Sequence, residues 1–150
     1  MAPDVFIAYS FDDQEIVDEL TKYLEDNGIS CFVADRDIAP GKEWADYIPP
    51  AIKNCKMMVY VHSEKADESI NINKEIALCS KYKHPILPFK ISDTKYTGAK
   101  EYYLETINWI DAFPNPKNYF GKLLTNIKQE IEKIRQEREK RLQEEIERSV

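Results

Sequence analysis

Apolar and polar positions along the chain follow two alternating periods, and together these predict a parallel α/β fold. Short apolar runs such as residues 5–9 are typical of strands that are buried on both faces of a sheet. Between the runs, apolar residues recur every three or four positions, as at Ile16, Leu20 and Leu24, and this spacing indicates amphipathic helices. Because strands and helices take turns along the chain, we expect a parallel sheet with helices on both faces.

The boundaries of the elements follow from the same pattern. Strands are expected at residues 5–9, 29–33, 57–61, 85–89 and 106–110. Helices are expected in the stretch before Gly28, at residues 43–54 and at residues 67–82. We expect Pro49-Pro50 to interrupt the helix at 43–54, since proline lacks the amide donor, and a fresh helix to start there. Two polar segments, residues 34–42 with a Pro-Gly turn and residues 92–103, are expected to be loops.

The strand order that we expect is the flavodoxin-like 2-1-3-4-5 of a five-stranded parallel sheet. In such sheets a ligand binds outside the carboxyl ends of the strands, where the strand order reverses, which is between the first and third strands here. Residues 10–12 and 62–68 border that crevice, and residues 34–42 lie alongside. The helix that follows residues 62–68 carries Glu75. This pattern therefore places Glu75 next to the expected ligand site.

The C-terminal part of the chain has a different pattern. A helical stripe of apolar residues continues from about Lys117 to Ile134, and beyond it only Leu142 and Ile146 interrupt an almost wholly charged sequence. Such a helix is usually solvated and held by pairs four residues apart. We therefore divide the chain into a domain at residues 1–116 and a long charged C-terminal helix at residues 117–150. The helix is a linker to another module, an arm used in pairing, or a protruding end.

Composition and charge narrow the class of protein. With 150 residues the chain is long enough for one domain with a substantial core. A net charge of -6 with scattered lysines disfavours nucleic acid as a partner, since phosphate groups need a basic face. No apolar run approaches the roughly 20 residues that span a bilayer. Residues 1–4 lack the basic start of a signal peptide, so we expect a cytoplasmic protein that does not enter the membrane.

Several common chemical motifs are absent from the sequence. Cys31, Cys55 and Cys79 form no CxxC pair, and the two histidines have no metal-like spacing, so we expect reduced thiols and no metal site. Neither the GxGxxG of a Rossmann site nor the GxxxxGK[ST] of a P-loop occurs. A receiver domain would need an aspartate at the end of the third strand, where this chain has Val61-His62-Ser63.

Four groups of residues stand in an order and spacing that are typical of one family. They are Asp4 to Ser10, which ends in Tyr-Ser; Asp35 to Lys42, with an acidic start and a Pro-Gly turn; Ser63 with Asn73-Lys74-Glu75-Ile76; and the segments Phe89 to Ile91, Tyr102 to Leu104 and Trp109 to Ala112. From about Asp4 to Phe113 the chain resembles a Toll/interleukin-1 receptor (TIR) domain of the prokaryotic, NAD+-cleaving type. The first three groups are similar to its opening strand, its BB loop and the segment that holds its catalytic glutamate.

The resemblance implies a reaction in which the nicotinamide–ribose bond of NAD+ is broken. NAD+ is the substrate, no cofactor is implied, and the products are nicotinamide and ADP-ribose or a cyclic isomer. Glu75 is the implied catalytic residue. Nicotinamide leaves without a general acid, so one carboxylate suffices to stabilise the positive charge that develops on the ribose. At the ordinary glutamate pKa of about 4.3 that carboxylate is ionised. The alternative is that Glu75 is a solvated residue paired with Lys74 or Lys81.

Further residues are candidates for substrate binding: Ser10, Phe11, Arg36, Trp44 and Asn71. Phe11 and Trp44 either stack on a ring of the substrate or pack against the protein. Arg36 meets a phosphate, a neighbouring subunit or only solvent, and Ser10 either contacts substrate or serves as a turn residue. Asn71 lies one helical turn before Glu75, where it would orient Glu75 or the ribose. Related domains have an aromatic residue at this point, so nicotinamide stacking is expected to differ here.

The resemblance also implies activation by assembly. The BB loop of one subunit, Asp35 to Lys42, would help to complete a neighbour's site, and the C-terminal helix would transmit the signal of a sensor domain or partner. The protein would then be an effector or signal generator in prokaryotic immunity. One alternative is a non-enzymatic adaptor that acts through TIR–TIR contacts, against which the carboxylate of Glu75 argues. Another is an enzyme resembling nucleoside deoxyribosyltransferases, which the Pro-Gly loop fits poorly.

Overall fold

The sheet contains five parallel strands in the order β2-β1-β3-β4-β5 in the computed structural model, which describes residues 2–150. The strands are β1 (Val5–Ala8), β2 (Cys31–Phe32), β3 (Met57–His62), β4 (Ile86–Lys90) and β5 (Ile110–Asp111). The central strand β3 is buried along its whole length, with Val5 of β1 opposite Met57 and Ile86 of β4 opposite Met58. The predicted flavodoxin-like order is confirmed.

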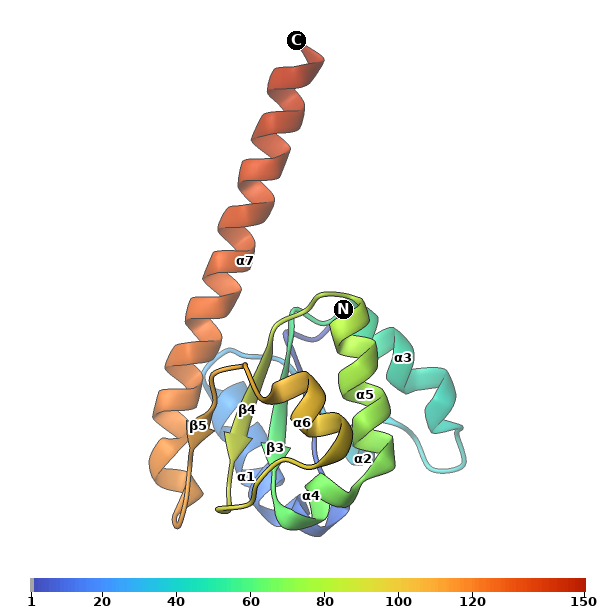
Figure 1. Cartoon of the computed structure of the whole chain (residues 1–150). Helices are drawn as coiled ribbons and strands as arrows, with labels where there is room; N and C mark the ends of the chain where they lie inside the picture. The colour runs from blue at the N-terminus through green and yellow to red at the C-terminus, as the bar shows by residue number, and fades with distance from the viewer. Residues whose placement is uncertain (1) are drawn as a thin grey trace.

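Helices cover both faces of this sheet (Figure 1). They are η1 (Phe11–Asp13), α1 (Gln14–Asp26), α2 (Ala34–Asp37), α3 (Trp44–Asn54), α4 (Glu64–Glu68), α5 (Ile70–Lys81), α6 (Gly98–Leu104), η2 (Pro116–Tyr119) and α7 (Phe120–Ser149). The apolar cores divide them into two layers: α1 and α7 pack on one face, and α3, α5 and α6 pack on the other.

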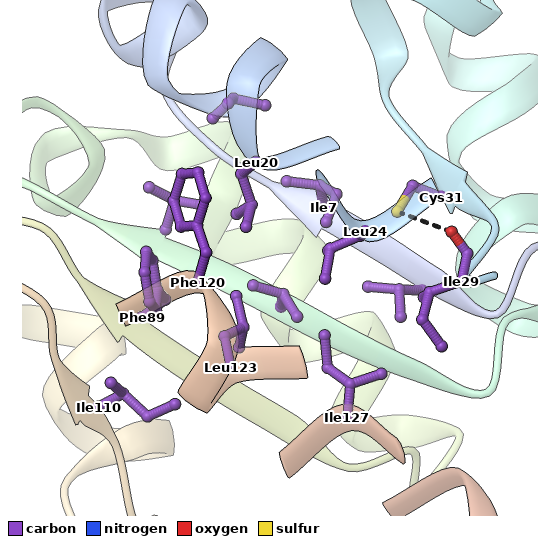
Figure 2. Close-up of a cluster of buried hydrophobic side chains, with 14 of the residues drawn as sticks. Ile7, Leu20, Leu24, Ile29, Cys31, Phe89, Ile110, Phe120, Leu123 and Ile127 are labelled. Carbon is purple, nitrogen blue, oxygen red and sulfur yellow. Dashed lines mark hydrogen bonds between the residues drawn. The ribbon is translucent and has the colours of Figure 1, made fainter. Parts of the chain in front are cut away.

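The core under α1 and α7 requires the start of the C-terminal helix. Figure 2 shows Phe120, Leu123 and Ile127 pointing into the same cluster as Leu20 of α1 and Phe89 of β4. Leu123 and Ile127 are completely buried. A division of the chain at residue 116 therefore separates residues that pack together, because the first turns of α7 complete the core of the domain.

The helix through Pro49-Pro50 is continuous, so the predicted interruption is wrong. α3 begins at Trp44 and runs through both prolines to Asn54. The prolines remove two backbone hydrogen bonds, which would have joined them to the carbonyl groups of Ala45 and Asp46. Both of these residues are exposed, so water can hydrate the two carbonyl groups and the helix need not end.

Four other elements differ from those predicted from the sequence. The segment 34–42 contains the short helix α2, and the supposed loop at 92–103 contains most of α6. The helix expected at 67–82 is two helices, because Ser69 ends α4 and caps α5 by accepting a hydrogen bond from the amide of Ile72 (3.2 Å). The last strand lies at Ile110–Asp111 rather than at 106–110.

Beyond its first turns, α7 extends away from the domain (Figure 1). Every residue from Arg135 onwards is exposed, including Leu142 (54%) and Ile146 (57%). The outer part is held by pairs along the helix, such as Arg135 with Glu132 and Glu139. Among the described residues, no helix has the length and apolar character needed to cross a bilayer.

Removal of residues 137–150 is expected to change the free energy of unfolding by no more than about 0.5 kcal/mol, because the deleted residues touch only solvent and their own helix. Leu123→Ala is the contrasting variant and should cost about 3 kcal/mol, since it leaves a cavity in the core. Urea denaturation followed by circular dichroism measures both changes. If truncation lowered the free energy of unfolding by several kcal/mol, the outer helix would have to make stabilising contacts with the domain or with a second copy.

Candidate active site

A cavity of about 530 Å³ opens between α3 and α5, beside the carboxyl end of β1. Glu75 lies in its wall, on the second turn of α5. The structure brings four of the predicted substrate-binding residues to the same cavity: Ser10, Phe11, Trp44 and Asn71. They come from three segments that are distant in the sequence. The topology of the sheet therefore gathers most of the predicted site in one place.

The segment after β1 forms one wall of the cavity. Ser10 caps η1, since its hydroxyl accepts from the amide of Asp12 (3.3 Å) and donates to the carboxylate of Asp12 (3.1 Å). This cap supports the interpretation of Ser10 as a turn residue. The next residue, Phe11, is 68% exposed and lines the cavity. Ser63, at the end of β3, donates a hydrogen bond to Asp13 (2.5 Å) and so ties this wall to the central strand.

The opposite wall belongs to α3. Trp44, the first residue of α3, is 48% exposed and borders the cavity together with Ile48 and Pro49. Phe11 and Trp44 also line a second, smaller hollow, and Glu75 is part of its lining too. The structure thus places two exposed aromatic rings near one carboxylate. Exposed rings of this size are the side chains on which a planar base or pyridine stacks.

The carboxylate of Glu75 has an environment that the sequence did not reveal. Burial raises the pKa of Glu75 to about 8, and the positive charge of Lys100 opposes this rise. The ordinary pKa that was expected for this carboxylate therefore does not hold in the empty site, where the shift favours the neutral form at pH 7. Neither Lys74 nor Lys81 forms an ion pair with it within residues 2–150. A carboxyl group shifted in this way is typical of functional sites.

Asn71 and Arg36 differ in their relation to the cavity. Asn71 is exposed and lines it one turn before Glu75. Arg36 does not line it: its guanidinium contacts Glu25 (2.6 and 3.0 Å), Asp37 (2.9 Å) and the carbonyl oxygen of Cys31 (2.8 Å). Through these contacts the guanidinium group of Arg36 holds the start of the 34–42 segment in place. The structure therefore leaves Arg36 outside the candidate site.

Sequence reasoning missed several residues of the site. Tyr9 and Lys74 line the cavity, and Lys100 influences Glu75 from α6. Tyr9 belongs to the same Tyr-Ser pair as Ser10, so the motif itself contained a signal for it. Lys100 lies in the segment that was expected to be a polar loop, and no pattern in the sequence distinguishes it from the exposed lysines around it.

A second groove of about 590 Å³ lies at the amino ends of β3 and β4, against α7. Its lining contains amide side chains such as Asn108, Asn126 and Gln129. It is as large as the first cavity, but it is at the end of the strands where parallel sheets do not bind their ligands. We therefore assign the chemistry to the cavity that contains Glu75.

Comparisons with known proteins bear on the fold and the family of the chain. The TIR domain of the Toll-related receptor TRR-2 from Hydra magnipapillata is 26% identical, with a TM-score of 0.71 over 85% of this chain and 99% of that one. A TIR-STING receptor from C. gigas, in complex with 2',3'-cGAMP, is 21% identical, with a TM-score of 0.65 over 83% of this chain and 39% of that one. The CMP N-glycosidase BcmB from Clostridium botulinum is 21% identical, with a TM-score of 0.60 over 79% and 95%.

The last two proteins are each 21% identical to this chain, and their similarity shows a shared fold. A search of curated proteins finds no match. The family comparison is more decisive, since the family described as TIR domain matches residues 5–124, which include every strand and the cavity. The chain therefore belongs to the TIR domain family.

Proposed function

We propose that the protein is an NAD+ glycohydrolase in which Glu75 is the catalytic residue. The observation that carries this proposal is a carboxyl group of raised pKa in the wall of a cavity of about 530 Å³, with the rings of Phe11 and Trp44 beside it. That volume is within the range of small-molecule sites. The cavity combines one acid with aromatic surfaces, which is what cleavage of a cationic pyridine nucleotide requires.

The reaction needs little more than this arrangement. The C–N bond between ribose and nicotinamide breaks, and its electron pair goes to the pyridine nitrogen, which becomes neutral. Positive charge then develops on the ribose, and the ionised carboxylate of Glu75 stabilises it. Water adds to the ribose carbon and loses a proton to give ADP-ribose; a nucleophile within the substrate would give a cyclic isomer instead. No acid has to protonate the leaving group.

Burial of Glu75 suits a cationic substrate. In the empty site the carboxyl group is mostly neutral at pH 7, since its pKa is about 8. A pyridinium ring placed next to it favours the carboxylate form, because an opposite charge lowers the pKa of an acid. Binding of NAD+ would therefore create the charge that the transition state needs. Once formed, the carboxylate acts in surroundings with little water, where its effect on developing charge is strong.

We also propose that assembly of several copies regulates this site. The segment 35–42 is exposed except at Ile38, which is 4% exposed and anchors it. The exposed outer part of α7 offers a second route for a sensor domain or partner. One similar structure is that of TIR domains in the activated Roq1 resistosome, 23% identical with a TM-score of 0.53 over 59% of this chain and 57% of that one. The role in prokaryotic immunity, as effector or signal generator, is part of this proposal.

The test is release of nicotinamide from NAD+ by the purified protein at high concentration, both free and artificially clustered. Wild type should release nicotinamide, clustering should increase the rate, and Glu75→Ala should reduce it to the level of an enzyme-free blank. CMP is assayed in parallel, because a neighbour in fold is a CMP N-glycosidase. Release of cytosine without nicotinamide would change the substrate class. Equal and negligible turnover by wild type and Glu75→Ala, even when clustered, would favour the non-enzymatic adaptor.

A further inference from the structure

Lys100 of α6 is completely buried, with 0% of its surface exposed. A buried ammonium group is tolerated only when it regains hydrogen bonds for those it loses to water. The Nζ atom of Lys100 donates to the carbonyl oxygens of Asp67 (3.0 Å) and Ser69 (3.0 Å) and to the side-chain oxygen of Asn73 (2.5 Å). An ammonium has three hydrogens, so each of them has one acceptor.

These three acceptors surround the break between α4 and α5. Asp67 is in α4, Ser69 caps both helices, and Asn73 is in the first turn of α5. Carbonyl groups at the end of a helix lack partners within the helix, and a cation is favourable there. Glu75 follows Asn73 by two residues on α5. The ammonium group therefore fixes the start of the helix that carries Glu75.

A second connection joins α6 to the same break. The carboxylate of Asp67 accepts from the backbone amide of Thr97 (3.0 Å) and from its hydroxyl group. Thr97 precedes α6 at its N-cap position. At the other end of α6, Leu104 is buried in the core beneath α5. Thus α6 is held to the α4–α5 break by the contact of Thr97 with Asp67 and by the ammonium group of Lys100.

The charge of Lys100 also reaches Glu75. Burial raises the pKa of Glu75, and Lys100 lowers it. The reverse effect is present too, since burial lowers the pKa of Lys100 while Asp67 and Glu75 raise it. The other ionisable groups in the wall of the cavity are Lys74 on α5 and Tyr9 after β1. Neither of them has a comparable influence on Glu75, so Lys100 is the main cation that favours its ionised form.

We propose that Lys100 is a positioning residue for the active site: its buried ammonium group holds the α4–α5 break and the first turn of α5 in place, and with them the position of Glu75. It touches no substrate, because it lies behind the helix and does not line the cavity. The expected effect of Lys100 on catalysis rests on the proposed NAD+ cleavage. Its expected effect on the pKa of Glu75 can be measured without any substrate.

The test is Lys100→Met, which keeps a long side chain and removes the charge. The midpoint of the pH dependence of kcat/KM for nicotinamide release should rise by about one unit, and the rate at pH 7 should fall about tenfold. The matched control is Lys95→Met in the same segment, because Lys95 is exposed and the change in net charge is the same. Its pH dependence should equal that of wild type. An unchanged midpoint in folded Lys100→Met would overturn the inference.

A second variant decides the matter if Lys100→Met does not fold. Lys100→Gln removes the charge and keeps a polar side chain that can donate to the same carbonyl oxygens. It should shift the midpoint upward in the same direction. NMR titration of the carboxyl carbon of Glu75 measures its pKa directly in each protein. The signal of this carbon is assigned as the one that is missing from the spectrum of Glu75→Gln. An inactive wild type would contradict the proposed function, whereas an equal pKa of Glu75 in wild type and both variants would contradict only the role of Lys100.

Discussion

Glu75→Gln is expected to lower the kcat for nicotinamide release by about 10²–10³-fold, which corresponds to roughly 3–4 kcal/mol of transition-state stabilisation. Glutamine has the same shape but does not carry the negative charge that stabilises the ribose cation. The positive charge on the ribose develops only in the transition state. The loss should therefore appear in kcat more than in KM. Steady-state assays of nicotinamide release at several NAD+ concentrations measure both constants.

Glu68→Gln is the matched control for this prediction. Glu68 lies at the end of the neighbouring α4, its side chain is 61% exposed, and the chemical change is identical. Its kcat should stay within about twofold of wild type, in line with the small effects of most surface changes. Retention of more than a third of wild-type kcat by Glu75→Gln would show that the carboxylate does not stabilise the transition state. An equal loss in Glu68→Gln would indicate a general charge effect.

Activity should also rise steeply with pH. The pKa of Glu75 in the empty site is about 8, and only the ionised form stabilises the ribose cation. The value of kcat/KM should therefore increase about tenfold per unit below pH 7 and about 50-fold in all between pH 6 and pH 8. The midpoint for kcat should lie at lower pH, because bound NAD+ brings a positive charge next to the carboxylate. A kcat/KM that is flat from pH 6 to pH 9 would contradict this assignment.

Stability should change with pH in the opposite direction. The folded-state pKa of Glu75, about 8, is above its value in the unfolded chain, so the folded protein binds this proton more tightly. The stabilisation is complete below about pH 4, declines as the pH rises and is lost above pH 8. Glu75→Gln cannot ionise, so at pH 9 it should be more stable than wild type by about 1–3 kcal/mol. Urea denaturation at pH 6 and pH 9 checks both the sign and the difference.

Hydrophobic periodicity was sufficient to predict the architecture. A run such as residues 57–61 has to be buried on both faces, and only the middle of a parallel sheet covered by helices provides this environment. The pattern was less informative where polar residues are buried or prolines are solvated. The sequence pattern does not predict the helix α6, because its buried side chains include Lys100. It predicts a break in α3, because the exposure of Ala45 and Asp46 cannot be inferred from the sequence.

The family, the strand order and the candidate catalytic residue Glu75 could all be predicted from the residues, because these predictions depend on local spacing and on motifs of a few residues. The packed structure was needed to show that the pKa of Glu75 is raised, that Arg36 contacts Glu25 and Asp37, and that Lys100 lies behind α5. A pKa or an ion pair depends on which distant segments meet and how much water they exclude. That information arises when α3, α5 and α6 pack together on the sheet.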